Sequence, residues 1–307
     1  MSMNIIHLLT ELIPCLLIGY LIGKFNENLS LLIASPLIQF GIPISIMGIL
    51  LKSGLNGKLI QGALMAWLAI ASLAAIIIKS PLIKKNIYGR TLQLGSIFGN
   101  TGYFGIPVSL ALLPSQALSY SIGFDLGATL IIWSIGPLLL TQETSILQVH
   151  SRIVSFFNAI IKSPASKGLF GAIIVNLTPW HEQITSSLWA PSKIVILLAL
   201  VIIGIRLSQI GDFNESTILL QLKVIQNSLI LKLIGFPFVM LFMCLMLRLP
   251  SLMRSALVLQ AAAPTAISVL LIAEKFSCDK DKATWLVALS TLTALITIPI
   301  WALILTL

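Results

Sequence analysis

Two stretches of the sequence combine helix-breaking residues with polar side chains inside otherwise apolar surroundings. The first covers residues 95–107 (Gly-Ser-Ile-Phe-Gly-Asn-Thr-Gly-Tyr-Phe-Gly-Ile-Pro), and the second covers residues 260–268 (Gln-Ala-Ala-Ala-Pro-Thr-Ala-Ile-Ser). Proline removes a backbone donor, and glycine lowers the cost of non-helical dihedral angles. A helix that opens has free N–H groups at one new end, which attract anions, and free carbonyls at the other, which attract cations.

These two stretches are therefore predicted to form a substrate-binding site. The predicted ligands are Asn100, Thr101, Gly102, Gly105, Pro107, Pro264, Thr265 and Ser268, with Gln39 and Pro43 as candidates from an earlier apolar run. Small residues also permit close helix packing, and a single proline merely kinks a helix. We assign the Gly19-x-x-x-Gly23 pattern to packing. The functional interpretation is preferred for 95–107 because glycine, amide, hydroxyl and proline coincide there and have a counterpart at 260–268.

Ionisable side chains inside apolar runs are further candidates, because each costs at least about 2.5 kcal/mol at the centre of a membrane helix. Asp125 is interpreted either as a carboxylate that couples transport to a proton or sodium ion, or as a carboxylate paired with a neighbouring helix near the membrane surface. Glu11 is a second ion-coupling candidate, or a residue that hydrogen-bonds across a helix bundle. Lys232 is expected near the end of a span, with its ammonium reaching toward the surface.

The composition requires a membrane around these residues. The chain has 307 residues, of which 57% are hydrophobic and 9% charged, and its mean hydropathy is +1.03. A soluble domain carries about 25% charged residues, so a soluble enzyme or a soluble nucleic-acid-binding domain is excluded. The three cysteines are an odd number, and neither a disulfide framework nor a zinc site is expected.

A membrane-spanning helix needs about 20 mostly apolar residues. Uncharged runs of that kind cover residues 31–51, 59–78, 91–113, 255–273 and 284–307. Runs with one ionisable residue cover 5–23, 115–140 and 228–247, and two weaker spans are placed at about 167–180 and 191–207. The sequence therefore predicts an all-α polytopic membrane protein with ten transmembrane helices.

The positive charges predict the orientation of these spans. The net charge is +9, with 19 lysines and arginines. Thirteen of them fall in loops on one side, whereas the other side holds Lys52, Lys58, Arg248 and Arg254. Cytoplasmic loops carry the excess of positive charge, so both termini are expected to face outward. The charge is thus a topology signal, and no nucleic-acid partner is expected.

One long polar connection divides the ten spans into two sets of five. We predict a first five-helix repeat at residues 1–141, a central cytoplasmic loop at 142–163, and a second repeat at 164–307. Because five is odd, the second repeat must enter the membrane from the opposite face. Inverted repeats of this kind, with interrupted helices at matching places, are common in secondary transporters.

The segment from Gly99 to Pro107, Gly-Asn-Thr-Gly-Tyr-Phe-Gly-Ile-Pro, resembles the fourth-span motif of the auxin efflux carrier family. Further matches to that family are Ala-Pro-Thr-Ala-Ile-Ser at 263–268, Ala-Glu-Lys at 273–275 and Thr-Ile-Pro at 297–299. The resemblance covers nearly the whole chain, and the short central loop is similar to that of bacterial members. Ser268 stands where many relatives carry asparagine, so the substrate preference of a relative is not carried over.

The resemblance implies a transporter in which the fourth and ninth helices break and cross. One domain is then a scaffold, and the other carries a small organic anion, a carboxylate or an auxin-like molecule, by an elevator-type motion. Asn100, Thr101, Pro107, Pro264, Thr265 and Ser268 would form the crossing. The family also implies a multi-pass protein of the cell (inner) membrane and suggests a homodimer.

Several other functions were weighed against this one. A passive uniporter and a sodium-coupled bile-acid-type symporter of related fold remain alternatives. An enzyme is not expected, because the sequence has no nucleophile elbow, no His-Glu-x-x-His motif and no intramembrane aspartate pair. A pump driven by a nucleotide is excluded by the lack of a phosphate-binding loop. No cofactor is expected, and His7, His150 and His181 lack metal-ligand spacing.

Overall fold

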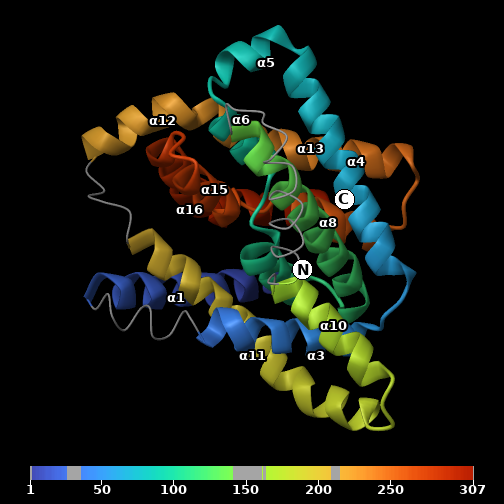
Figure 1. Ribbon diagram of the computed structural model, residues 1–307. Helices are drawn as coiled ribbons and strands as arrows, with labels where there is room; N and C mark the ends of the chain where they lie inside the picture. The colour runs from blue at the N-terminus through green and yellow to red at the C-terminus, as the bar shows by residue number, and fades with distance from the viewer. Residues whose placement is uncertain (1, 26–35, 141–160, 162–163, 209–214, 307) are drawn as a thin grey trace, which may run out of the picture.

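The computed structural model describes residues 2–25, 36–140, 161, 164–208 and 215–306, and its regular elements are helices (Figure 1). Five of them are long and apolar enough to cross a membrane, at 57–79, 115–134, 181–205, 217–246 and 280–304. Shorter apolar helices cover 12–25, 39–53 and 101–112. The expected central loop at 142–163 lies outside the described residues, except for Ile161. The chain is therefore a polytopic helical membrane protein.

Side chains cap two of the first five helical elements that the structure describes. These elements are α1 (Ser2–Phe25), the π-helical turn η1 (Leu37–Gly41), α3 (Ile42–Ser53), α4 (Gly57–Lys79) and α5 (Pro81–Asn86). Asn56 caps α4, since its side chain accepts a hydrogen bond from the N–H of Lys58 at 3.0 Å. Ser80 ends α4 and caps α5, whose first residue is a proline.

The stretch expected to be interrupted forms two short helical pieces and is followed by one long helix. The pieces are α6 (Arg90–Ile97) and, after a break at 98–100, the π-helical turn η2 (Thr101–Gly105), which continues into α7 (Ile106–Leu112). The long helix is α8 (Ser115–Leu140). The interruption expected within 95–107 is thus confirmed.

The later part of the chain contains the second interrupted helix. Its elements are α10 (Pro164–Asn176), α11 (His181–Ser208), α12 (Glu215–Ile230), η3 (Leu231–Gly235), α13 (Phe236–Met246), α14 (Ser251–Ala261), α15 (Ile267–Lys275) and α16 (Lys280–Ile304). Two predicted boundaries are wrong. Helix α11 runs through Pro191 instead of starting there, and the helix assigned to 228–247 already begins at Glu215, with η3 and α13 continuing it.

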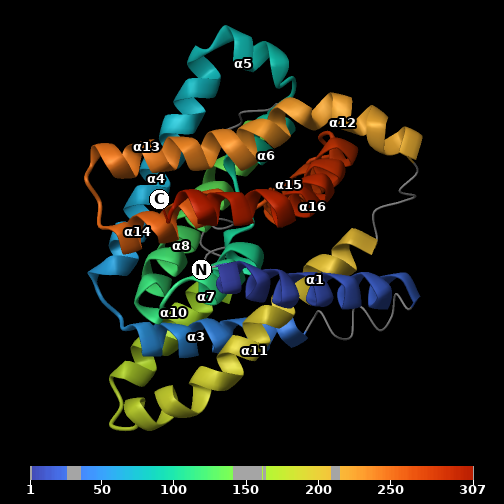
Figure 2. The same ribbon diagram turned by 180° about the vertical axis from the view of Figure 1, so that it is seen from behind.

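The helices form two groups that lie on either side of α7 and α8. In one group α1 packs on α11, and α3 packs on both α10 and α11. In the other group α12 packs on α16, α13 on α14 and α15 on α16, and α4 packs along α8. Figures 1 and 2 show the first group in the lower part of the molecule and α12 to α16 in the upper part. Because α7 contacts α1, α11 and α14, the interrupted stretches lie where the two groups meet.

Glycine brings helices into backbone contact in both groups. A methyl group on Gly19 of α1 would overlap the carbonyl of Val201 in α11, and one on Gly204 would overlap the carbonyl of Leu16. In the same way, Gly62 of α4 lies against the backbone of α8, and Gly123 of α8 lies against the backbone of α4. Small residues let membrane helices approach this closely, so the packing role expected for Gly19 is confirmed.

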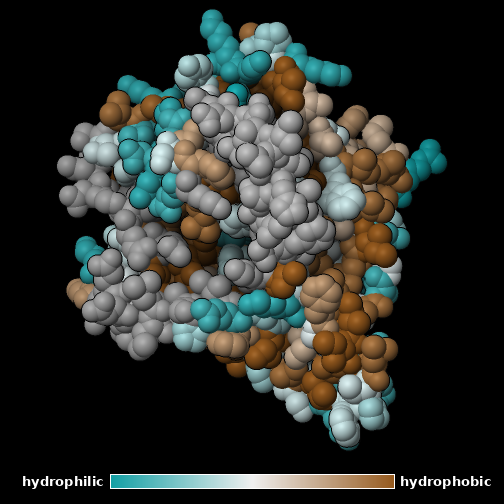
Figure 3. Space-filling view, viewed as in Figure 1, coloured by the Kyte–Doolittle hydropathy of each residue, from teal (hydrophilic) through white to brown (hydrophobic). Residues whose placement is uncertain are grey.

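The outer surface of the helices is apolar. On α16 the exposed side chains recur every three or four residues, at Leu292, Ile296, Ile300 and Leu303, which is the spacing of one helix face. Figure 3 shows further apolar side chains in the lower right, over the region of α10 and α11, and α10 exposes Phe170, among others. An apolar outer face on helices of this length suits contact with lipid tails.

Candidate functional site

The two interrupted stretches cross and pair through their backbones. The N–H of Ala266 donates to the carbonyl of Phe98 at 3.0 Å, and the N–H of Asn100 donates to the carbonyl of Pro264 at 2.6 Å. These bonds place Gly99 opposite Thr265 in an isolated antiparallel bridge. Backbone groups released by a helix break must find partners inside a membrane, and here each break supplies them to the other.

Thr265 fastens this crossing to two further helices. Its hydroxyl donates to the carbonyl of Gly95 in α6 at 3.0 Å, and its N–H donates to the hydroxyl of Ser290 in α16 at 3.0 Å. The Thr265 side chain is completely buried. Its contacts show that it positions the crossing.

A buried ammonium lies at the end of α14. Lys232 is completely buried in η3, and its Nζ donates to the carbonyl of Ala261, the last residue of α14, at 2.8 Å. The carbonyl end of a helix dipole favours a cation. Glycine at position 99 leaves the necessary space, because a Cβ there would lie 3.0 Å from the same Nζ. The prediction that Lys232 reaches toward the surface is therefore wrong, since it lies near the middle of the 217–246 helix.

A buried carboxylate lies at the start of the other half-helix. The hydroxyl of Thr101, the first residue of η2, donates to Oδ1 of Asp125 in α8 at 2.5 Å. Asp125 is 6% exposed, and a Cβ on Gly102 would lie 3.2 Å from the same Oδ1. The N-terminal end of a helix favours a negative charge. Each of these two buried charges thus lies at the helix end that stabilises it.

A second buried polar cluster joins α7, α8 and α14. The hydroxyl of Ser121 donates to that of Ser109 at 2.9 Å, and Nε2 of Gln260 donates to the same Ser109 oxygen at 3.1 Å. Oε1 of Gln260 has no partner in the described part of the chain, and a Cβ on Gly105 would overlap this amide. No ligand role was predicted for Gln260 from the sequence. The sequence feature that could have identified Gln260 is a polar amide side chain inside an apolar run.

The other residues predicted for the site fall into two sets. Asn100 is 4% exposed, its carbonyl accepts the N–H groups of Phe104 and Gly105, and its Nδ2 has no partner among the residues that the structure describes. Pro107 is buried as the second residue of α7, and Ser268 is half-buried in the first turn of α15. These residues belong to the crossing or to the half-helices that leave it.

The remaining predicted residues belong to α1, η1 and α3. Gln39 is exposed in η1, and the Pro43 carbonyl in α3 lies against Gly168 of α10. Glu11 belongs to α1, and its side chain lies outside the described part of the structure. The structure thus brings together the residues of the two interrupted stretches and adds Lys232 and Gln260 to them.

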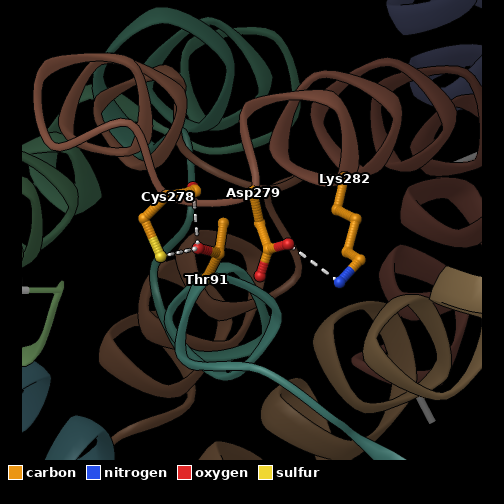
Figure 4. A network of polar contacts seen from close by, with 4 residues as sticks. All are labelled: Thr91, Cys278, Asp279 and Lys282. Atoms are coloured by element: carbon orange, nitrogen blue, oxygen red, sulfur yellow. Dashed lines mark hydrogen bonds and ion pairs between the residues drawn. The ribbon is translucent and has the colours of Figure 1, made fainter.

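A polar junction fixes the outer end of α6 (Figure 4). The hydroxyl of Thr91 donates to the carbonyl of Cys278 at 3.1 Å, with the Cys278 sulfur at 3.5 Å as a second, weaker acceptor. Asp279, in the same turn between α15 and α16, pairs with Lys282 in the first turn of α16 at 2.9 Å. The start of one interrupted helix is therefore held against the end of the other.

Comparisons with known proteins agree with a transport role. A family model described as membrane transport protein matches residues 5–302, which include both interrupted stretches. A protein described as an uncharacterized transporter, from Methanothermobacter thermautotrophicus (strain ATCC 29096 / DSM 1053 / JCM 10044 / NBRC 100330 / Delta H), is 26% identical over 223 residues. That similarity covers 71% of this chain and 69% of the relative. Within the described residues, no group of three or more His, Cys, Asp or Glu side chains is arranged to hold a metal ion.

Proposed function

The chain belongs to the membrane transport protein family, and we propose that it is a secondary transporter of a small organic anion, either a carboxylate or an auxin-like molecule. The observation that carries this proposal is the crossing of two interrupted helices beside a buried ammonium. A transport site formed by interrupted helices offers a substrate backbone groups that a continuous helix keeps paired.

The electrostatics of the crossing favour an anion over a cation. Two half-helices, η2 with α7 and α15, begin there, and their N-termini carry partial positive charge. No side chain caps α15 at Ala266. Nδ2 of Asn100 is a buried donor without a partner among the described residues, and the Lys232 ammonium is buried beside Gly99. A carboxylate group would accept a hydrogen bond from the Asn100 amide, which a cation cannot do.

The residues proposed to line the substrate site follow from this arrangement. Asn100 and Ser268 offer side-chain donors, while Gly102 and Gly105 leave room for a ligand to approach the backbone. Pro107 and Pro264 keep the half-helices interrupted, and Thr101 and Thr265 position the crossing through their hydrogen bonds. Gln39 and Pro43 lie near the start of α3 and are proposed to act from the side of the first helix group.

The arrangement of helices supports an elevator-type mechanism. α1 packs on α11, and α10 packs on α3. The first span of each half therefore lies against the second span of the other half. This exchange is what inverted repeats at 1–141 and 164–307 produce. We propose ten spans, a scaffold formed by α1, α3, α10 and α11, and a moving domain that contains the crossing. In the cell membrane both termini would face outward.

Ion coupling is preferred over passive transport because of Asp125. A carboxylate held at the crossing by Thr101 is a suitable site for a coupling ion, either a proton or sodium. A passive uniporter does not need such a group. The related alternative, a sodium-coupled bile-acid-type symporter, differs by requiring sodium for binding.

Flux measurements on purified protein in proteoliposomes test this function. Malate, malonate and indole-3-acetate would be applied with and without sodium and with and without a pH gradient. We expect accumulation of at least one of these carboxylates against its gradient, and a loss of most of it in Asn100→Ala. Equilibration without accumulation would establish the passive uniporter instead, and a strict sodium requirement would establish the sodium symporter. No flux of any of the three would contradict an organic-anion carrier of this class.

A further inference from the structure

We propose that Asp125 takes up one proton for each substrate anion that binds, so that the protein works as a proton-coupled symporter with one proton per substrate. This inference rests on the proposed function and names its coupling ion. It follows from the position of two opposite charges along one short segment of the crossing.

The segment from Gly99 to Gly102 faces a charge at each of its ends. The Lys232 ammonium would lie 3.0 Å from a Cβ on Gly99, and the Asp125 carboxylate would lie 3.2 Å from a Cβ on Gly102. Both charged groups are buried, and no salt bridge joins them. Each is instead held by a neutral partner, the carbonyl of Ala261 or the hydroxyl of Thr101.

The charge balance of this site then dictates the coupling. With no substrate, the Lys232 ammonium and the Asp125 carboxylate sum to zero. A bound monoanion would add an uncompensated negative charge inside the membrane, where such charges are expensive. A proton on Asp125 restores the sum to zero, so the empty site and the site loaded with both substrate and proton can cross equally well. A site loaded with the anion alone carries net charge and crosses poorly.

Thr101 links the proton to the substrate. While Asp125 is ionised, it can only accept hydrogen bonds, and the Thr101 hydroxyl donates to it. After a proton from the aqueous phase binds to a carboxylate oxygen, the acid becomes a donor itself. The Thr101 hydroxyl can then accept that hydrogen bond and donate a hydrogen bond of its own to the substrate anion, while its O–H bond stays intact. No covalent bond other than the O–H bond of Asp125 forms or breaks.

The other charged groups on helices that pack against α8 lie at helix ends. Lys58, at the start of α4, lies 5.7 Å from the centre of the Tyr120 ring and 3.5 Å from the Gln116 carbonyl. Arg254 is half-buried near the start of α14, and Tyr103 is half-buried in η2 itself. The remaining ones whose side chains the structure describes are exposed, namely Lys52, Lys79, Arg90, Lys167 and Glu274. Lys232 is thus the one fully buried cation in the described part of the chain.

The test uses full-length protein in proteoliposomes that contain a pH-sensitive dye, with malate, malonate and indole-3-acetate as probes. We expect inward proton flux equal to substrate flux. A monoanion then moves no net charge, whereas a dianion leaves one negative charge uncompensated and should move more slowly. Asp125→Asn resembles the protonated acid and still accepts the Thr101 hydrogen bond. It should therefore keep exchange of internal for external substrate but lose at least tenfold in accumulation driven by a pH gradient. Glu274→Gln, an exposed acid paired with Lys280 at 3.2 Å, is the matched control and should behave as the unaltered protein.

A second measurement follows the proton without any substrate. The infrared band of a protonated carboxylic acid should appear as the pH falls and should be missing in Asp125→Asn. The proposal would be overturned if the two proteins showed the same infrared band. It would also be overturned if Asp125→Asn accumulated substrate normally in a pH gradient, or if sodium drove the accumulation instead of protons. If Asp125→Asn does not change carboxylate uptake, the proposed transport function is retained and the proton coupling by Asp125 is contradicted. If the infrared band titrates but none of the three probes is taken up, both the transport function and the coupling are contradicted.

Discussion

The crossing and the α1–α11 contact both depend on glycine, but they use it for opposite purposes. At Gly19 and Gly204 the missing side chain lets two backbones touch, and the neighbouring atoms are carbonyls of Val201 and Leu16. At Gly99 and Gly102 the missing side chain makes room for a charged group. Gly19 and Gly204 thus allow close helix packing, whereas Gly99 and Gly102 place the backbone next to an ammonium and a carboxylate.

On the proposed function, this difference separates residues that stabilise the helix packing from residues that bind the substrate. Helix packing in the first group is neutral and tight, as suits a scaffold. Among the described residues, five buried side-chain polar atoms lack a partner, and two of them, Nδ2 of Asn100 and Oε1 of Gln260, lie at the crossing. Unpaired buried polar groups cost stability, and we propose that the substrate pairs with those at the crossing. Variants in the two regions should therefore fail in different assays.

The largest effect is expected for Lys232→Met. This variant removes the one full positive charge at the crossing and leaves the Ala261 carbonyl unpaired, which costs about 1–3 kcal/mol of stability. Transport should fall by about a hundredfold or more, since a charge-assisted bond of about 3 kcal/mol corresponds to that factor. Uptake and thermal unfolding in detergent measure the two effects. Lys223→Met, an exposed lysine on α12, is the control and should alter neither, while normal uptake in Lys232→Met would remove the ammonium from the site.

Gly19→Ala should destabilise the α1–α11 contact without affecting the crossing. Its methyl group overlaps the Val201 carbonyl, and overpacking of this kind costs about 1–3 kcal/mol. We expect a lower unfolding temperature with unchanged transport per folded molecule. Gly57→Ala adds the same methyl group where no atom lies within 4 Å and should leave the unfolding temperature unchanged. A transport defect in Gly19→Ala that is larger than its loss of folded protein would contradict the division between scaffold and site.

Asn100→Ala should sharpen the comparison, because it lowers transport without lowering stability. Nδ2 of Asn100 has no partner in the described structure, so its removal loses no internal bond. A hydrogen bond to a charged ligand is worth about 1.5 kcal/mol or more, and transport should fall about tenfold. Asn227→Ala is the control, since that amide donates to the Asn86 carbonyl at 3.0 Å, away from the crossing. Equal uptake by the two variants would place the substrate elsewhere.

The smallest effect is expected at the polar junction of Figure 4. Thr91→Val keeps the shape of the side chain and removes its hydrogen bond to the Cys278 carbonyl. The expected loss is about 1 kcal/mol of stability with transport within twofold of normal. Thermal unfolding measures this loss of stability. Thr284→Val, on an exposed turn of α16, is the control variant. A loss of transport without a loss of stability would assign this junction to the moving parts of the mechanism.

The sequence predicted the interruptions because their cause is local. Glycines and a proline lie close together within 95–107, and a proline lies within 260–268. These residues weaken a helix in their own segment, and the structure breaks at 98–100 and 262–266. The pairing of Gly99 with Thr265 is not local. It joins residues far apart in the chain, and residue types alone do not indicate which backbone groups meet.

The missed residues have a related explanation. Lys232 was placed near a span end because polar residues such as Lys223 and Asn227 made the first turns of its helix look like a loop. The helix continues through them, and the lysine falls at mid-length. Likewise, Asp125 and Thr101 were each chosen as candidates from their own segments, but their hydrogen bond depends on how α8 packs on η2.

The central claim, that an organic anion binds where the two interrupted helices cross, is tested most directly by substrate protection at Ser268. Cys15, Cys244 and Cys278 would be replaced by alanine, and Ser268→Cys would then be labelled with a charged, water-soluble thiol reagent. Gly57→Cys in the same background is the control. We predict that whichever of malate, malonate and indole-3-acetate is transported slows labelling at 268 but not at 57. Labelling at 268 that proceeds at the same rate with the transported anion would contradict binding at the crossing.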